Sequence, residues 1–255
     1  GNPEKPEIYW QLSESVRGIR EACIEFDTPV TGGNVSLYNE SNGVDIWPTP
    51  VIGMVGYLED VTSAANSYFK DAGDTIILLG EEKNEIGASE YLYLKTKKIQ
   101  GQVPELDFSL EKKVQSSVRE LIKNKLIKSA NDCSVGGLLV TLSECAFEKD
   151  LGFKLKCHSH ENGNPGLASK DWIPDQVGND NMRLDATYFG ETQSRIVISC
   201  SKDKLSNIEK QLKTEDCPYK VIGEVTNGDI EVLGQKVDVK DLKDKWQNSF
   251  GSLFN

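Results

Sequence analysis

The sequence predicts a mixed α and β protein, and three observations support that prediction. Apolar residues recur at helical spacing in several segments, whereas other short segments are β-branched and apolar throughout. The two kinds of segment alternate along the 255 residues, which is typical of helices packed on a sheet. Serine, alanine and asparagine dilute the apolar pattern near 61–72, so we expect two domains, 1–65 and 66–255.

The first domain is predicted to contain one long helix and one strand. The helix spans 8–27, where residues such as Leu12 and Val16 share a face, and Pro29 cannot continue it. The strand is an apolar run at 51–58 whose glycines indicate close backbone packing or a bulge.

Between these two elements lies the sequence Gly-Gly-Asn-Val-Ser at 32–36. Glycine lets the backbone turn through positive φ or approach a ligand closely, and successive N–H groups can bind an anion. Asn34 offers a neutral oxygen that Mg²⁺ accepts, and Ser36 offers a donor and an acceptor. The residues alone leave a metal–phosphate corner and a tight turn open, and they favour the turn, with Asn34 tolerating a left-handed conformation.

The second domain is predicted to alternate strands and helices. Ser109 is the expected N-cap of its longest helix. Asn227-Gly228-Asp229 is typical of a hairpin turn and is predicted to pair the last two strands with each other. The predicted strands are 74–80, 153–157, 194–200, 219–225 and 230–239, with a short strand or turn within 129–134, and the predicted helices are 109–128, 138–148, 203–213 and 240–248.

Two further motifs could carry chemistry. The diglycine in Asp132–Gly137 begins a helix whose N–H groups would favour an anion, but a helix start capped by Ser134 is the favoured interpretation. In Gly190–Arg195 we expect Arg195 to pair with a carboxylate. No site residue is assigned in either motif.

Charge and composition exclude several classes. A net charge of −11 argues against nucleic-acid binding, and no apolar run approaches the roughly 18 residues of a membrane span. The six cysteines form no C-x-x-C pair, so we expect buried thiols and a cytoplasmic location. The segment 158–182, which holds His158 and His160, is predicted to be a passive surface insert, with an active-site lid as the alternative.

Five motifs occur in the order of one known family: GNPEKPEIYWQL, EACIEFDTPVTGGNVSLYNE, PTPVIGMVGYLED, DCSVGGLLVTLSECAF and RLDATYFGETQSRIVIS. Together they resemble the second half of phosphoribosylformylglycinamidine synthase, small-subunit type (synthase II), over nearly the whole chain except the segment near 158–182. Because the chain begins inside the first motif and has no initiator methionine, we expect a fragment of a longer polypeptide.

The resemblance implies a fold and a set of site residues. The fold would be a partial N-terminal-type α+β domain, 1–65, followed by a complete C-terminal-type α/β domain, 66–255, of the aminoimidazole ribonucleotide synthetase-like superfamily. By resemblance, ATP lies against Gly33, Asn34 is a Mg²⁺ ligand, and Ser36 binds the substrate. The catalytic histidine of the family belongs to the other half, so no catalytic residue is assigned here. The Gly190–Arg195 loop is similar to the substrate-binding loop of the first half of the family.

The resemblance also implies an activity and partners. The family is an ATP-dependent amidoligase of purine biosynthesis that makes formylglycinamidine ribonucleotide from formylglycinamide ribonucleotide and glutamine-derived ammonia. A glutaminase subunit and a small bridging subunit would be its partners, and an exposed strand edge would favour a homodimer of this fragment, which is expected to be inactive alone. The alternatives are aminoimidazole ribonucleotide synthetase, selenophosphate synthetase, or a non-catalytic assembly module.

Overall fold

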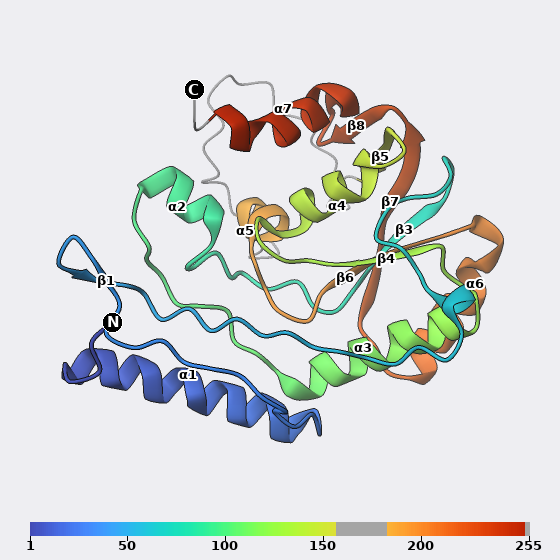
Figure 1. The fold of residues 1–255 in the computed structure, drawn as a ribbon. Coiled ribbons are helices and arrows are strands. Elements are labelled where there is room, and N and C mark those ends of the chain that lie inside the picture. The colour runs from blue at the N-terminus through green and yellow to red at the C-terminus, as the bar shows by residue number, and fades with distance from the viewer. Residues whose placement is uncertain (157–182, 253–255) are drawn as a thin grey trace. The chain divides into compact units, whose positions relative to one another are not determined.

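The computed structural model describes residues 1–156 and 183–252, which cluster into two compact units, Gly1–Glu59 and Asp60–Asn255 (Figure 1). The insert expected at 158–182 therefore lies outside the described residues. Within the described ranges, no helix combines the length and the apolar character that a membrane crossing requires.

The first unit is built on α1, Pro6–Glu25, which confirms the predicted long helix. Pro6 stands at the first helical position, where its missing N–H leaves no hydrogen bond unmade. Two short antiparallel strands follow, β1 (Glu40–Ser41) and β2 (Val44–Asp45). The turn between these strands has positive φ at two successive residues, 52° at Asn42 and 76° at Gly43, as a tight hairpin requires.

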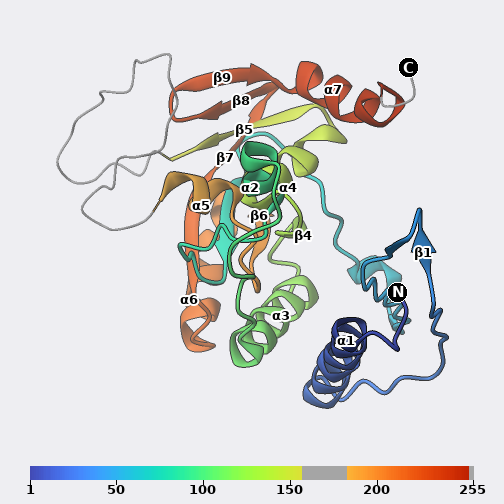
Figure 2. The same ribbon diagram turned by 90° about the vertical axis from the view of Figure 1, so that its left-hand side faces the viewer.

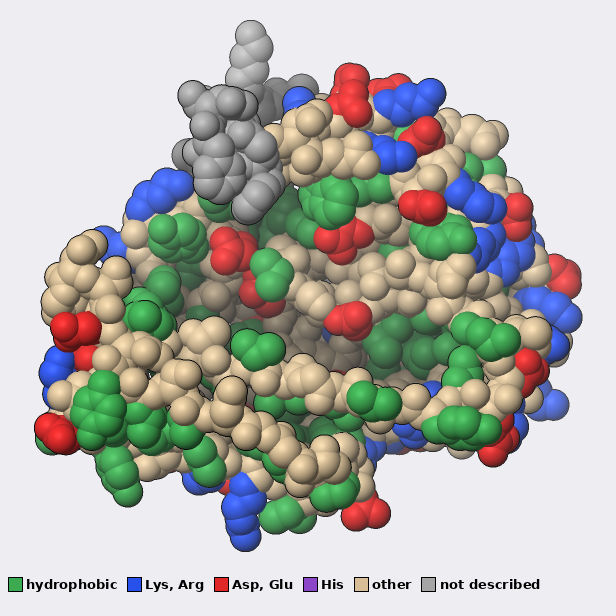
Figure 3. Space-filling view, in the orientation of Figure 1, with side chains coloured by type: hydrophobic (Ala, Val, Ile, Leu, Met, Phe, Trp, Pro, Cys, Tyr) green, Lys and Arg blue, Asp and Glu red, His purple; other side chains and the backbone are tan. Residues whose placement is uncertain are grey.

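The strand predicted at 51–58 is wrong. These residues form neither helix nor strand, and Val55 and Tyr57 are exposed by 103% and 90%. A strand needs a partner for its ladder of N–H and C=O groups, and the described residues supply none to this run. Figure 3 shows hydrophobic side chains exposed over α1 and the segments that follow it.

The second unit contains, among the described residues, a seven-stranded sheet in the order β4-β6-β3-β7-β5-β8-β9. Every neighbouring pair is antiparallel except β5 and β8, which run parallel. The strands are β3 (Thr75–Leu79), β4 (Ser129–Asp132), β5 (Leu151–Leu155), β6 (Ile196–Cys200), β7 (Tyr219–Asn227), β8 (Asp229–Val232) and β9 (Gln235–Asp238).

Helices cover both faces of this sheet (Figures 1 and 2). Along the interior strand β3, Ile76 and Leu78 belong to a core cluster shared with α4, α5 and α7, whereas Ile77 and Leu79 belong to a second cluster shared with α3 and α6. This alternation follows from the two-residue period of a strand. The helices of the unit are η1 (Val61–Ser63), α2 (Glu90–Thr96), α3 (Phe108–Lys123), α4 (Gly137–Phe147), α5 (Leu184–Phe189), η2 (Lys202–Lys204), α6 (Leu205–Thr214) and α7 (Val239–Ser252).

The hairpin predicted around Asn227-Gly228-Asp229 is also wrong. Strand β5 lies between β7 and β8 and pairs with both, so these two strands do not pair with each other. The chain does reverse there, with φ of 83° at Gly228, but β5 already occupies that edge of β7. The actual hairpin joins β8 to β9 through Leu233 and Gly234, which both have positive φ.

The caps of two helices differ from the prediction. The Asp107 carboxylate accepts from the N–H groups of Ser109 (2.8 Å) and Leu110 (3.1 Å), so Asp107 and not Ser109 is the N-cap of α3. Ser134 does not cap α4, because its hydroxyl donates to Asp132 Oδ2 at 2.5 Å. At α3 the side chain that reaches the helix start is one residue before the helix, whereas at α4 the N-cap residue is Gly136, which has no side chain to serve as a cap.

Candidate functional site

The Gly32–Ser36 segment is irregular and exposed and contains no turn, so the favoured tight turn is wrong. Residues 28–37 form neither helix nor strand, and positive φ values are found at neither Gly32 nor Gly33. An added Cβ on either glycine would meet no atom within 4 Å. The backbone at Gly33 is therefore open to close approach by a ligand.

The irregular residues 28–37, called the open segment below, are anchored at both ends within the first unit. After α1, the Thr28 N–H donates to the carbonyl of Cys23 at 2.9 Å. At the other end, the Tyr38 N–H donates to the carbonyl of Gly1 at 2.9 Å. The structure thus holds the nine intervening residues at their ends and leaves Asn34 and Ser36, both exposed, without a hydrogen bond to any described residue.

Asp45 fixes the start of the chain beside this segment. Its carboxylate accepts from the N–H of Asn2 at 2.9 Å and from Lys5 Nζ at 2.5 Å. The hydrogen bond from Lys5 holds the pKa of Asp45 below its usual range, and the same contact raises the pKa of Lys5. The first residues of the chain are therefore tied to strand β2, and the carbonyl of Gly1 is in place to anchor Tyr38.

The polar groups of the open segment are of the kinds found in a metal–phosphate site, but they would form only part of one. Asn34 supplies a neutral oxygen, Ser36 a hydroxyl, and Gly33 an unobstructed backbone. Within residues 1–156 and 183–252, no group of three or more acidic, histidine or cysteine side chains is placed to hold a metal ion. Asn34 could therefore supply one neutral oxygen to a metal ion, and the described residues place no cluster of carboxylates around it.

In the second unit, the Asp132–Gly137 motif forms the turn into α4. Gly136 and Gly137 have φ of 84° and 71°, and an added Cβ on Gly137 would lie 2.5 Å from the carbonyl oxygen of Gly190. The Gly136 N–H, which the helix cannot satisfy, donates to Glu191 Oε1 at 2.9 Å. The diglycine thus binds an anion, as its position favours, and that anion is a carboxylate of the same chain.

The Gly190–Arg195 loop is organised by Arg195, whose side chain is almost fully buried. Contrary to expectation, no carboxylate of the described residues pairs with it. Its guanidinium donates instead to the carbonyl oxygens of Thr192 (Nε, 3.2 Å) and Gly190 (Nη2, 2.5 Å). Backbone carbonyl oxygens therefore pair with Arg195 in place of the carboxylate that was expected from the sequence.

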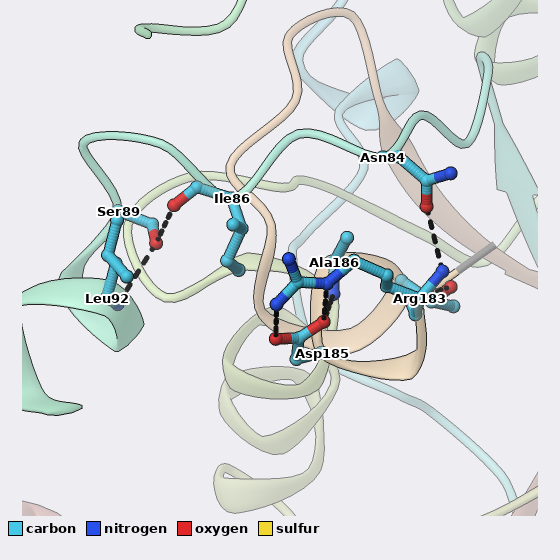
Figure 4. Close-up of polar contacts among 8 residues, drawn as sticks. Asn84, Ile86, Ser89, Leu92, Arg183, Asp185 and Ala186 are labelled. Atoms are coloured by element: carbon cyan, nitrogen blue, oxygen red, sulfur yellow. Dashed lines mark hydrogen bonds and ion pairs between the residues drawn. The ribbon is translucent and has the colours of Figure 1, made fainter. Parts of the chain in front are cut away.

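A third polar cluster was not expected from the sequence (Figure 4). Arg183 donates from Nε to Asp185 Oδ1 at 2.9 Å and from Nη2 to Oδ2 at 2.5 Å, a two-point contact with a buried carboxylate. The Arg183 N–H also donates to Asn84 Oδ1 at 2.8 Å, which joins the start of α5 to the segment after β3. The spacing Arg-x-Asp is the local signal, but Asn84 lies 99 residues away and no local pattern indicates it.

Comparison with known proteins identifies the family. The model described as "AIR synthase related protein, C-terminal domain" matches residues 71–236, and the model for the N-terminal domain of the same family matches residues 1–58. The chain belongs to the AIR synthase related protein family. The predicted mixed α and β fold of this superfamily is thereby confirmed.

Curated relatives confirm the resemblance that the motifs indicate. The chain is 37% identical over 258 residues to phosphoribosylformylglycinamidine synthase subunit PurL of Alkaliphilus metalliredigens (strain QYMF), covering 99% of this chain and 32% of the relative. It is 43% identical over 251 residues to the same subunit of Anaeromyxobacter sp. (strain Fw109-5), covering 97% of this chain and 31% of the relative. The chain therefore spans about a third of the length of the curated relatives that it matches.

Solved structures support the fold. The structure titled "T. maritima PurL complexed with FGAR" matches with a TM-score of 0.54 and 17% identity, covering 72% of this chain and 30% of that one. Phosphoribosylformylglycinamidine synthase II from Thermotoga maritima matches with a TM-score of 0.50 and 19% identity, covering 72% of this chain and 28% of that one.

Proposed function

We propose that this chain is part of an ATP-dependent carbon–nitrogen ligase of purine biosynthesis, a phosphoribosylformylglycinamidine synthase. The observation that carries the proposal is the continuous match, at 37% and 43% identity over 99% and 97% of the chain, to relatives with that name. Because the chain spans about a third of those relatives, the proposal assigns it part of the enzyme and no complete reaction.

The proposed reaction has two steps. ATP transfers its γ-phosphoryl group to the amide oxygen of formylglycinamide ribonucleotide, which releases ADP. Ammonia derived from glutamine then attacks the activated carbon, and phosphate leaves with that oxygen to give the amidine. Backbone dipoles, together with a Mg²⁺ ion held in part by Asn34, would offset the charge on the phosphoryl group, so the protein would act mainly by positioning.

Within this reaction, the open segment would bind ATP and substrate. Gly33 would let ATP approach the backbone, Asn34 would supply one oxygen to a Mg²⁺ ion, and Ser36 would bond the ribonucleotide. Support comes from the local structure, because an added Cβ at Gly33 meets nothing within 4 Å and both side chains are exposed. No general base is assigned, so the remaining groups would come from other parts of the longer protein.

The proposal extends to domains and partners. Residues 1–65 would complete an ATP-site domain with strands from elsewhere in the protein, and 66–255 would be its C-terminal-type companion. The relatives are named as a subunit, which supports a multi-subunit enzyme. We propose that a glutaminase subunit and a small bridging subunit are the other members of this assembly, and that the assembly is cytoplasmic. The apolar surface of the first unit would favour a homodimer of this chain in isolation.

The test is an assay of the longer polypeptide, with phosphate release measured in the presence of ammonia and formylglycinamide ribonucleotide. Asn34→Ala is compared with Asn39→Ala, a second exposed asparagine of the same unit with no assigned role. We expect Asn34→Ala to lower the rate by at least tenfold and to shift its Mg²⁺ dependence to higher concentration, while Asn39→Ala matches the wild type.

Two results would contradict the proposal at different levels. Equal rates for the two variants would remove Asn34 from the metal site and favour an assembly module for this part of the protein. Absence of ribonucleotide-dependent phosphate release from the wild-type polypeptide, supplied with ammonia, would overturn the assigned reaction itself.

A further inference from the structure

The N-terminus of α4 is bonded to a carboxylate from a distant part of the chain. Glu191 Oε1 accepts the Gly136 N–H at 2.9 Å and also the Glu90 N–H, at the start of α2, at 2.9 Å. One carboxylate oxygen therefore satisfies unpaired N–H groups at the starts of two helices, across 55 and 101 residues of sequence.

The local sequence explains why α4 needs a distant acceptor. The residue at its N-cap is Gly136, which has no side chain, and the structure shows no side-chain cap there. The nearby hydroxyl of Ser134 is bonded to Asp132 instead. By contrast, α3 is capped by its own neighbour Asp107. The Gly137 N–H donates to the carbonyl of Ser134 at 3.0 Å, so Glu191 supplies the acceptor for the Gly136 N–H at the positive end of α4.

The backbone on both sides of Glu191 is held in place. Arg195, 2% exposed, donates to the carbonyl oxygens of Gly190 at 2.5 Å and Thr192 at 3.2 Å, which are the residues that flank Glu191. Gly190 itself has no room for a side chain, because an added Cβ would lie 2.4 Å from the carbonyl oxygens of both Glu85 and Ala186. The carboxylate is thus directed by a buried cation and close backbone packing.

We propose that Glu191 is an internal anionic latch. Its carboxylate occupies the N-terminus of α4 in place of an anion from solution, and it ties the start of α2 to the turn before α4. Arg195 is the positioning residue that directs it. This inference rests on hydrogen bonds within the second unit, whereas the proposed function rests on the match to relatives, so each can fail without the other.

The test uses the full chain with Glu191→Ala, Glu191→Gln and the control Gln193→Ala. Gln193 is exposed, and its side chain bonds the backbone carbonyl of Glu191 and not the carboxylate. Amide hydrogen exchange is read at Gly136 and Glu90, and thermal unfolding is followed in sodium phosphate and in sodium chloride of equal ionic strength.

We expect Glu191→Ala to lower protection at both amides by about tenfold or more, as for loss of a charge-assisted hydrogen bond. Inorganic phosphate, compared with chloride, should then raise the Tm of Glu191→Ala and restore protection at Gly136. The wild type and Gln193→Ala should show no phosphate-specific shift. Glu191→Gln, which keeps an acceptor without the charge, should lose less protection than Glu191→Ala.

Unchanged protection in Glu191→Ala would overturn the latch, and so would a wild type that phosphate stabilises as strongly as the variant. If Glu191→Ala does not fold, the same exchange measurement is made on the isosteric Glu191→Gln, and wild-type protection at both amides would then overturn the latch.

Arg195→Lys tests the positioning residue. It keeps the charge but lacks the forked guanidinium group that reaches two carbonyl oxygens, so it should lower protection at Gly136 and Glu90 together. Full protection in Arg195→Lys would remove Arg195 from the positioning role.

Discussion

The two compact units differ in what their apolar side chains contact. In Gly1–Glu59, no residue is buried, although α1 is a 20-residue helix and the unit contains large apolar side chains such as Trp10 and Val55. In Asp60–Asn255, two clusters of buried residues fill the two faces of the sheet. An amphipathic pattern therefore predicts a helix in both units, but a core forms only where the partner surfaces belong to the same unit.

This difference leads to the largest expected effect, which appears when the units are separated. A chain of residues 60–255 should unfold cooperatively in urea, because it retains both core clusters. A chain of residues 1–59 should show no cooperative transition, since it buries no apolar side chain to offset conformational entropy. Circular dichroism during a urea titration measures both, and a sharp transition in 1–59 would contradict the comparison.

A pair of glycines sharpens the comparison at single residues. Gly80 has φ of 94°, and an added Cβ would lie 2.0 Å from the carbonyl oxygen of Ser194, whereas an added Cβ at Gly33 meets nothing within 4 Å. Gly80→Ala should lower the free energy of unfolding by about 3 kcal/mol or more through strain and overpacking. Gly33→Ala should change it by less than about 0.5 kcal/mol.

Urea unfolding of the two variants checks this prediction, and comparable losses would contradict it. The same pair also separates folding from binding. In the longer polypeptide, Gly33→Ala should lower ATP-dependent phosphate release while the fold persists, because the added methyl group occupies the space proposed for ATP.

Buried thiols predict a pH dependence for the second unit. Burial raises the pKa of Cys145 to about 12 and that of Cys200 to about 11. Both thiols stay protonated in the folded state above pH 9, where those of the unfolded chain ionise. Their contribution to stability is therefore complete below pH 9 and is lost as the pH rises above it.

Between pH 8 and pH 10, each of these thiols should remove about 1 kcal/mol from the free energy of unfolding. Urea titrations at the two pH values measure the loss in wild type and in Cys145→Ala. The variant starts from a lower stability but should lose about 1 kcal/mol less on going to pH 10. An equal loss in both proteins would show that Cys145 does not contribute to the pH dependence.

The same contrast explains which parts of the structure could be predicted from the sequence. The run at 74–80 predicted a strand, and β3 confirms it, because four successive apolar side chains, 76–79, match a strand buried on both faces. The run at 51–58 has a similar apolar pattern and forms no strand, because pairing depends on a partner that the pattern does not contain. The hairpin at Asn227–Asp229 failed for a related reason, since a third strand, β5, occupies the edge.

The candidate site divides in the same way. Gly33, Asn34 and Ser36 were identified together because they lie within four residues and match a family motif, and their assigned roles remain proposals. The contacts of Glu191 could not be predicted, because its partners lie 55 and 101 residues away and each contact is made by a backbone N–H. Nearly every residue has a backbone N–H, so the identity of a residue does not indicate that its N–H bonds a distant carboxylate. Only the fold shows which N–H groups a carboxylate reaches.

The smallest expected effect concerns the N-cap of α3, where sequence and structure disagree within one turn. The Asp107 carboxylate accepts two N–H groups, from Ser109 at 2.8 Å and Leu110 at 3.1 Å, whereas Ser109, the cap predicted from sequence, lies inside the helix. Asp107→Ala should therefore lower the free energy of unfolding by about 1 kcal/mol, and Ser109→Ala by less than about 0.5 kcal/mol. Urea unfolding of the two variants decides between the caps. If Ser109 were the cap, Ser109→Ala would lower the free energy of unfolding more than Asp107→Ala. Buried contacts of α3 with the sheet, at residues such as Val114 and Leu121, keep the helix folded in both variants, so the difference measures the cap alone.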